Sequence, residues 1–436
     1  MASDQYGPAR SRLRIAMRAL GSRNYRLFFA GQGISLIGTW MQRIAVSWLV
    51  YRLSGSALWL GMVNFFGQLP TFLIAPYAGV VADRFNKRRI IVITQVFSMV
   101  QALLLGVLAL TGTVAVWQVM VLSVVLGLIN GFDVPTRQSF VVEMVDNRED
   151  LGNAIALNSF MFNGARLIGP SIAGILIATA GEGVCFLVNG LSYIAVIYSL
   201  LAMRMPRRDI RPSRRPILHE LKEGVVYAFG SLPIRSILLL LSLVSLMGMP
   251  YVVLLPIVAK DVLHGGAHTL GFLAAATGVG ALGGAFFLAS RESVVGLVRM
   301  IFLASTAFGL ALAAFSFSNI FWLSFVILMV VGFAMMTQMA SCNTVLQTIV
   351  SDEKRGRVMS FYTMAFMGMA PFGSALAGVL ADKIGTPRTL LISGVACLAG
   401  ALWFSTRIPA MRRAIRPIYI EKGILPAEEP QISESR

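Results

Sequence analysis

The sequence predicts an all-α integral membrane protein whose twelve transmembrane helices form two pseudo-symmetric six-helix bundles. Three observations support this fold class: the composition, a count of apolar stretches and an internal repeat. Hydrophobic residues make up 56% of the 436-residue chain and charged residues only 13%, whereas a soluble domain carries about 25% charged residues. We therefore expect most of this chain to lie in a bilayer.

Twelve apolar stretches are each long enough to cross a membrane, which takes roughly 20 residues as a helix. Six of them fall in residues 25–203 and six in residues 233–408. The expected organisation is an N-terminal tail (1–24), a first bundle (25–203), a linker with an amphipathic helix (204–232), a second bundle (233–408) and a C-terminal tail (409–436). An even number of spans places both tails on one side.

The basic residues indicate which side that is. Of 37 Lys and Arg residues, 31 fall in the tails and in the loops after even-numbered spans. Because basic loops stay in the cytoplasm, both termini are expected to be cytoplasmic and the basic loops to contact anionic lipid. These residues are scattered over short loops without interleaved aromatic residues, which argues against a nucleic-acid partner.

The chain repeats itself with an offset of 204 residues. Residues 152–181 (GNAIALNSFMFNGARLIGPSIAGILIATAG) align without a gap on residues 356–385 (GRVMSFYTMAFMGMAPFGSALAGVLADKIG), and five glycines coincide. The fifth span therefore corresponds to the eleventh. Two like bundles around a central site are the architecture with which many secondary transporters achieve alternating access.

Two motifs carry a resemblance to a known family. The stretch GVVADRFNKRR (79–89) resembles the major facilitator superfamily signature between the second and third spans, with Asn86 in place of a glycine; Asn tolerates the left-handed turn that glycine permits. The stretch ARLIGPSIAG (165–174) is similar to a signature of the superfamily's exporters. GTWMQRIAVSWLVYRLSGSALWLG and VPTRQSFVVEMV look most like the enterobactin-exporter and macrolide-efflux branch, which comprises drug:proton antiporters.

The resemblance implies gating residues in both motifs. It places Asp83 against the start of the eleventh span, where a helix N-terminus favours negative charge by about 0.3–2 kcal/mol. In the fifth span, Pro170 removes a backbone hydrogen bond and the nearby glycines permit close helix approach. The alternatives are charges that only set topology and tight packing without a role in transport. The expected gating residues are Gly79, Asp83, Arg84, Arg88, Gly169, Pro170 and Gly174.

Polar residues inside the apolar stretches predict a substrate pathway. Arg166 lies about 14 residues from either end of its span, roughly 21 Å, so its side chain cannot reach interfacial water. It therefore needs a partner or an aqueous cavity, because an arginine at mid-bilayer costs at least about 2.5–3.5 kcal/mol. A buried structural pair is the alternative for Arg166 and Arg43. The expected substrate-binding residues are Arg43, Arg166, Gln42, Gln68, Asn158, Asn163, Gln338 and Tyr362.

The second half has no charged residue near the centre of a span, so aromatic and methionine side chains should form its cavity wall. One polar, cationic wall opposite one apolar wall predicts an amphiphilic substrate that bears negative charge or hydrogen-bond acceptors. Siderophore-like chelators, drug-like macrolides and lysolipids fit that description.

No G-x-x-x-x-G-K-[ST] phosphate loop is present, so direct use of ATP is not expected. Proton exchange, which the family resemblance implies, needs a group that titrates in the membrane; Asp133 is the first candidate and Asp83 the second. For Asp133 the alternative is a cap or ion pair at a helix end. Expelling an anion from a negative interior is another energy source, worth about 2.3 kcal/mol per charge per 100 mV.

The remaining classes of function find little support. His264 and His268 have the i, i+4 spacing of metal ligands, but no third ligand is near, so no metal and no cofactor are expected. No nucleophile, base and orienting group occur at helical spacing, so the protein is not expected to be an enzyme. The sequence thus predicts a monomeric transporter in the bacterial inner membrane that exports an amphiphilic small molecule in exchange for protons. Import of a small metabolite is the alternative.

Overall fold

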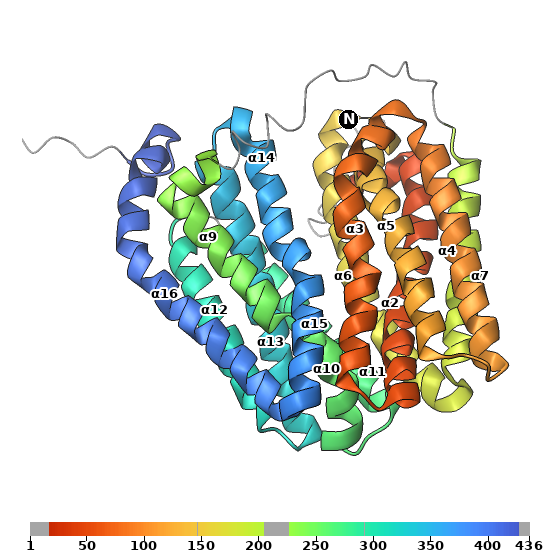
Figure 1. Cartoon of the computed structure of the whole chain (residues 1–436). Coiled ribbons are helices and arrows are strands. Elements are labelled where there is room, and N and C mark those ends of the chain that lie inside the picture. Colours follow the sequence, from red (N-terminus) through yellow and green to blue (C-terminus); the bar gives the residue numbers. More distant parts are fainter. Residues whose placement is uncertain (1–16, 146, 205–225, 292, 427–436) are drawn as a thin grey trace, which may run out of the picture.

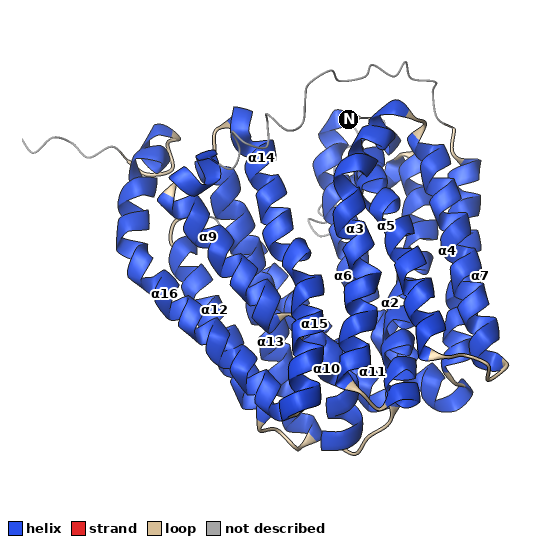
Figure 2. Ribbon diagram, viewed as in Figure 1, coloured by secondary structure: helices blue, strands red, loops and turns tan. Residues whose placement is uncertain are grey.

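The computed structural model describes residues 17–145, 147–204, 226–291 and 293–426, together with most of their side chains. This part of the chain contains long helices and no strand (Figure 2). The helices form two bundles that stand side by side (Figure 1). The predicted fold class is confirmed.

The first bundle begins after a short 3₁₀ turn, η1 (Arg18–Gly21), and contains six spanning helices. These are α2 (Arg23–Ser54), α3 (Ala57–Arg84), α4 (Lys87–Leu110), α5 (Val116–Met144), α6 (Leu151–Ala180) and α7 (Glu182–Ala202), with a 3₁₀ turn η2 (Arg148–Asp150) before α6. Five of the six meet a length and hydropathy criterion for membrane spans, and α2 is the exception. Its polar residues lower its mean hydropathy.

Spans seven and eleven of the second bundle are interrupted by π-helical turns. The seventh consists of α9 (Leu232–Leu243), η3 (Val244–Gly248), α10 (Tyr251–Ile257) and η4 (Val258–Val262); the eleventh consists of α14 (Asp352–Thr363), η5 (Met364–Gly368) and α15 (Met369–Ile384). The others are α11 (Ala267–Ala289), α12 (Leu297–Ser316), α13 (Phe321–Ile349) and α16 (Thr386–Glu421). The amphipathic helix expected in the linker falls largely on residues outside the described part of the chain.

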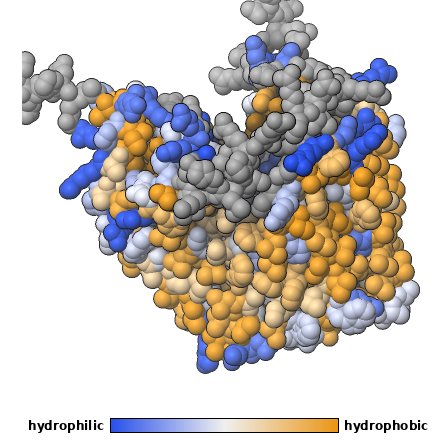
Figure 3. Space-filling model, turned by 45° about the horizontal axis from the view of Figure 1, so that its top comes forward, coloured by the Kyte–Doolittle hydropathy of each residue, from blue (hydrophilic) through white to orange (hydrophobic). Residues whose placement is uncertain are grey.

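Several helices run further than the apolar stretches that predict them. The fourth stretch ends near Phe132, yet α5 continues to Met144, and α16 continues to Glu421. These extensions end at the face where η1 and the end of α16 lie (Figure 1), which we call the basic face. Hydrophilic residues gather there, while apolar residues cover the sides of the bundles (Figure 3). One consequence is that Arg137 lies inside a helix and not in a loop.

The loop between α3 and α4 differs from expectation at Asn86. The residue has φ −66° and ψ 110°, so it is not left-handed. Its side chain accepts a hydrogen bond of 3.1 Å from the N–H of Arg89 and thereby caps α4. Asparagine is favoured at this position because its oxygen satisfies a free N–H of the first helical turn.

The two bundles meet through glycine pairs near the face opposite the basic one. On α11, a Cβ atom at Gly271 would lie 2.8 Å from the Cα atom of Gly174 on α6. On α3, a Cβ atom at Gly61 would lie 2.9 Å from the Cα atom of Gly378 on α15. Backbone therefore touches backbone at both crossings, as small residues allow in membranes.

The two crossings are related by the sequence repeat. Gly174 and Gly378 coincide in the 204-residue register, and each forms one of the two glycine crossings described above. The last glycines of the repeat, Gly181 and Gly385, end their helices with φ of +81° and +86°. The repeat therefore encodes equivalent backbone geometry in both halves.

Polar contacts reinforce the same junction. The hydroxyl of Tyr51 at the end of α2 donates to the carboxylate of Asp261 in η4, and the hydroxyl of Ser56 donates to Asp382 on α15 over 3.0 Å. The ammonium group of Lys260 lies 5.4 Å from the ring centroid of Tyr51. The bundles are thus joined at the opposite face, and their helices diverge toward the basic face (Figure 1).

A bulky side chain at a glycine crossing should prevent this closure. In Gly271→Leu the new side chain would collide with the backbone of α6, so we expect the opposite face to open. Spin labels at the exposed residues Leu53 and Lys383, one on each bundle, should show a longer mean distance in the variant. Gly356→Leu is the control, because a Cβ atom there would have no neighbour within 4 Å. Unchanged distances in Gly271→Leu would contradict the proposed closure.

Candidate functional site

Two arginines and one tryptophan converge near the middle of the first bundle's helices. The guanidinium carbon of Arg43 on α2 lies 4.8 Å from the ring centroid of Trp40, and that of Arg166 on α6 lies 5.9 Å from it. Arg43 is exposed and Arg166 half-buried. The sequence therefore located both arginines, and the structure shows that they share one aromatic partner.

Neither arginine is neutralised by the described part of the chain. No carboxylate forms an ion pair with Arg43 or Arg166, and neither side chain donates a hydrogen bond to a described residue. A cation–π contact is worth about 0.5–2 kcal/mol, less than the cost of at least about 2.5–3.5 kcal/mol for a charged arginine at mid-bilayer. The alternative of a buried pair with a carboxylate therefore finds no support among the described residues.

The exporter-type motif on α6 creates this arrangement. A Cβ atom at Gly169 would lie 2.5 Å from the Cβ atom of Trp40, so only a glycine lets α2 approach α6 this closely. The ring of Phe162 on α6 packs edge-on against Trp40, with centroids 5.7 Å apart. The motif therefore holds Trp40 and, through it, the two guanidinium groups.

The same helix touches the second bundle one turn further on. Pro170 has no N–H, so the carbonyl of Arg166, four residues earlier, lacks its usual helical partner. A Cβ atom at Gly278 on α11 would lie 3.5 Å from that carbonyl, and one at Gly271 would lie 2.5 Å from the carbonyl of Pro170. Arg166 and Pro170 thus lie at the junction of the bundles.

Tyr251 adds a side chain from the second bundle that the sequence reading missed. It is only 1% exposed, its hydroxyl forms no hydrogen bond of normal geometry, and Thr277 and the charge of Arg166 are its polar surroundings. It begins α10, directly after the interruption at η3. The only signal in the sequence was a tyrosine following Gly-Met-Pro in the middle of an apolar span.

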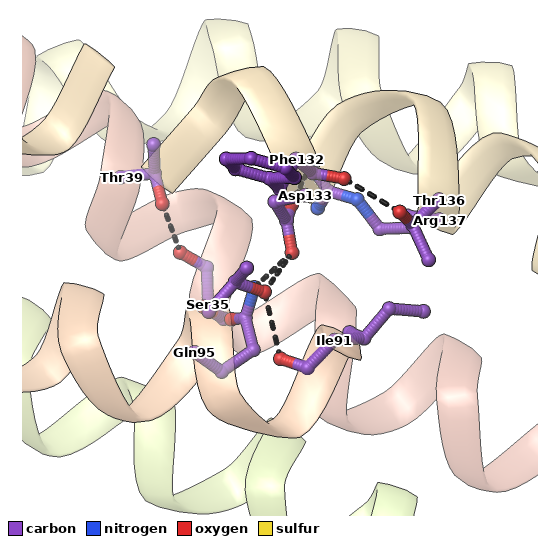
Figure 4. Close-up of polar contacts among 9 residues, drawn as sticks. Ser35, Thr39, Ile91, Gln95, Phe132, Asp133, Thr136 and Arg137 are labelled. Carbon is purple, nitrogen blue, oxygen red and sulfur yellow. Dashed lines mark hydrogen bonds and ion pairs between the residues drawn. The ribbon is translucent and has the colours of Figure 1, made fainter. Parts of the chain in front are cut away.

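Asp133 lies in a polar cluster inside the first bundle (Figure 4). It is 2% exposed; its Oδ1 accepts hydrogen bonds from Thr94 (2.9 Å) and Gln95 (2.8 Å) of α4, and its Oδ2 lies 2.8 Å from the guanidinium of Arg137. The ion pair that the sequence left as an alternative is therefore present. It lies between α4 and α5, and its ion-pair partner belongs to α5 itself.

A second polar cluster holds Gln42. Its amide donates to Gln101 over 3.0 Å and its oxygen accepts from Asn189 over 2.6 Å. All three side chains are buried, so Gln42 joins α2, α4 and α7 although it neighbours Arg43 in sequence. Its helical position alone did not distinguish a face turned to the cavity from one turned to the neighbouring helices.

The other expected substrate-binding residues are distributed along both bundles. Gln68 is exposed, and Asn158 and Asn163 are half-buried. Gln338 is buried with an amide nitrogen that has no partner, and Tyr362 donates to the carbonyl of Met339 over 3.0 Å. The hydrogen bonds of Gln68, Asn163 and Tyr362 go to backbone carbonyls and not to either arginine.

The loop motif is partly described. The surroundings of Gly79 and the side chain of Asp83 lie outside the described part of the structure, and Arg84 is exposed. Arg88 donates to the carbonyl of Leu201 over 2.6 Å, near the end of α7 in its own bundle. A cation at a helix C-terminus is favourable, so Arg88 has a stabilising contact within the first bundle.

The interrupted spans of the second bundle are joined at their π-turns. The hydroxyl of Ser245 in η3 donates to the carbonyl of Phe366 in η5. A Cβ atom at Gly368 in η5 would lie 2.6 Å from the ring of Phe72 on α3, so this junction also touches the first bundle. Such π-turns often occur at functional sites.

A separate cavity of about 500 Å³ lies at the opposite face. Its lining includes Trp48, the ion-paired Arg52 and Glu182, and His268. It contains neither central arginine.

Comparison with known proteins matches this architecture to a family. A family model described as transmembrane secretion effector matches residues 16–420. The chain belongs to that family. This transporter is 28% identical over 385 residues to the staphyloferrin A transporter of Staphylococcus aureus, covering 88% of this chain and 96% of the relative. It is also 28% identical to the multidrug efflux pump Tap of Mycolicibacterium fortuitum, covering 83% and 88%.

A solved structure shares the transporter's fold. It is a bacterial homologue of the human lysosomal transporter Spinster in an inward-facing and occupied conformation, with a TM-score of 0.69 and 14% identity over 95% of this chain and 99% of that one. The predicted membership of the major facilitator superfamily is thus confirmed. The transporter is a multi-pass membrane protein that carries a small-molecule substrate.

The buried cluster around Gln42 should contribute to stability. Gln42→Leu leaves polar groups of Gln101 and Asn189 unsatisfied, so we expect the free energy of unfolding to fall by about 1–3 kcal/mol. Thermal unfolding of the purified transporter in detergent measures this loss. Gln68→Leu, which replaces an exposed glutamine, should change stability by less than about 0.5 kcal/mol. Equal effects of the two substitutions would contradict a stabilising network.

Proposed function

We propose that this transporter exports an amphiphilic small molecule across the bacterial inner membrane by alternating access, in exchange for protons. The observation that carries the proposal is the pair of unpaired arginines at the junction of the bundles, since charges at mid-membrane need a cavity that water and substrate can enter. In this proposal the basic face is cytoplasmic, and both termini lie there.

The exporter-type motif on α6 and the similarity to a multidrug efflux pump support export. The bundles are joined at the face we assign to the outside, so substrate enters from the cytoplasmic side between the diverging helices. Gly169 holds Trp40 beside Arg166, and Gly174 forms the crossing with α11. One helix therefore connects the binding site to the closure that must open for release.

The outer closure consists of contacts that can separate and reform. We assign gating to the contact between Tyr51 and Asp261, to that between Ser56 and Asp382, and to the two glycine crossings. Asp83, with Gly79 and Arg84, would hold the cytoplasmic side closed in the opposite state. Arg88 stabilises the loop through α7.

Proton coupling is assigned to Asp133. Protonation removes the negative charge that Arg137 faces, and a buried guanidinium without its partner is strongly disfavoured. The pair therefore exists with Asp133 either ionised or protonated, and the packing of α4 against α5 can differ between these two states. The transporter acts as a monomer in contact with membrane lipid, without a catalytic activity.

Loss of the gene should change what cells release. We expect an amphiphilic compound to be depleted in the medium of cells without the gene, as measured by untargeted metabolite comparison, and to be restored by the wild-type gene. Arg166→Ala, expressed at the normal level, should reduce release at least about tenfold, since hydrogen bonds to a charged group are worth about 1.5–3 kcal/mol. Arg407→Ala removes an arginine that lies over Trp403 on α16, away from the junction, and is the control.

Export would be contradicted if no compound outside the cell depended on the gene. It would also be contradicted if a metabolite accumulated inside cells that carry the gene, as an importer requires.

Asp133→Asn should separate coupling from transport. The variant keeps a hydrogen-bonding side chain but cannot release a proton, so we expect uptake into inverted vesicles to lose its dependence on a proton gradient. Exchange of labelled for unlabelled substrate should continue. Glu421→Gln, at the end of α16, is the control. Full proton-driven uptake by Asp133→Asn would exclude this residue as the coupling group.

A further inference from the structure

We propose that the junction between the bundles contains an oxyanion-binding site formed by Arg43, Arg166 and Trp40 of the first bundle and Tyr251 of the second. Its ligand is a compound that carries at least two negative charges on carboxylate, sulfonate or phosphate groups. The inference rests on the proposed function, because the compound that binds there is the one transported.

The number of negative charges follows from the two guanidinium groups. The guanidinium carbons lie 4.8 Å and 5.9 Å from the centroid of Trp40, and each positive charge lies within the electrostatic range of the other. Neither has a carboxylate partner among the described residues. A ligand with one negative charge would leave one of them unneutralised, whereas two oxyanion groups neutralise both.

The oxyanion chemistry follows from the available donors. A guanidinium presents five N–H donors in a planar fork that matches two oxygens of a carboxylate or phosphate. Arg43 and Arg166 donate to no described residue, so their donors remain for a ligand. The contacts with Trp40 fix the orientation of both groups without using those donors.

Tyr251 contributes the second bundle's donor. Its hydroxyl is buried and forms no hydrogen bond of normal geometry, and the hydroxyl of Thr277 on α11 is its polar neighbour. It lies near enough to Arg166 to interact with its charge. A bound oxyanion that accepts from both residues links the two bundles, so its arrival and departure change the contact between them.

The positive charge of the site also excludes cationic ligands. Asp133 and Glu182 are buried acidic groups of the first bundle, and Arg137 and Arg52 respectively already form ion pairs with them. Two positive charges therefore remain in the cavity, and they repel cationic compounds. The site should prefer dianions over neutral compounds and reject monovalent organic cations.

Equilibrium binding to the purified full-length transporter in lipid nanodiscs tests the proposal without requiring transport. Radiolabelled phthalate is the first probe, and benzene-1,2-disulfonate and phenyl phosphate compete with it. We expect all three dianions to bind and their affinity to fall as salt concentration rises. Dimethyl phthalate, which is neutral, and phenyltrimethylammonium, which is cationic, should not compete.

The variants locate the site. Arg43→Gln and Arg166→Gln should each weaken phthalate binding at least about tenfold, and Tyr251→Phe several-fold. Arg43→Lys, which keeps the charge and loses the fork, should lie between wild type and Arg43→Gln. Arg407→Gln removes a second arginine that contacts a tryptophan, Trp403, and should bind phthalate as wild type does. Size-exclusion chromatography checks that each variant is folded.

Absence of binding for all three dianions, competition by phenyltrimethylammonium, or unchanged affinity in both arginine variants would each overturn the proposal. Export of a neutral or cationic compound with no dianion binding would leave the proposed function intact and refute the oxyanion site. Dianion binding without any gene-dependent export would support the oxyanion site and contradict the proposed function.

Discussion

The structure depends on one electrostatic constraint: two positively charged side chains lie within membrane-spanning helices without a negative partner in the described protein. Such charges are tolerated only where water or an anionic ligand reaches them. Arg43 and Arg166 are accordingly exposed or half-buried, and both lie against Trp40 at the junction of the bundles. An interior sealed on both sides would leave them uncompensated.

The close approach of α2 and α6 depends on a glycine. Gly169 brings the backbone of α6 against Trp40, and Gly174, five residues later, brings it against Gly271 of the other bundle. Because both contacts belong to one rigid helix, a movement that separates the bundles at Gly174 also displaces the wall of the site. The equivalent glycines of the repeat, Gly373 and Gly378, contact the seventh span and α3 in the same way.

The buried acid and the unpaired arginines form separate electrostatic systems. Asp133 is satisfied by Arg137 and by two donors of α4, so it needs no contact with the ligand.

The sequence by itself determined the membrane location, the helical class, the two related halves and the mid-membrane position of Arg166. These properties follow from composition, length and periodicity, which are local or repeated along the chain. It also showed that Gly169 and Gly174 allow close packing, but not that one contacts α2 and the other α11. Only the tertiary structure decided which residues meet: Trp40 with both arginines, and Gln42 with Asn189. A polar stripe on a helix has the same pattern whether it faces a cavity or a neighbouring helix, and only the packing of distant segments distinguishes the two.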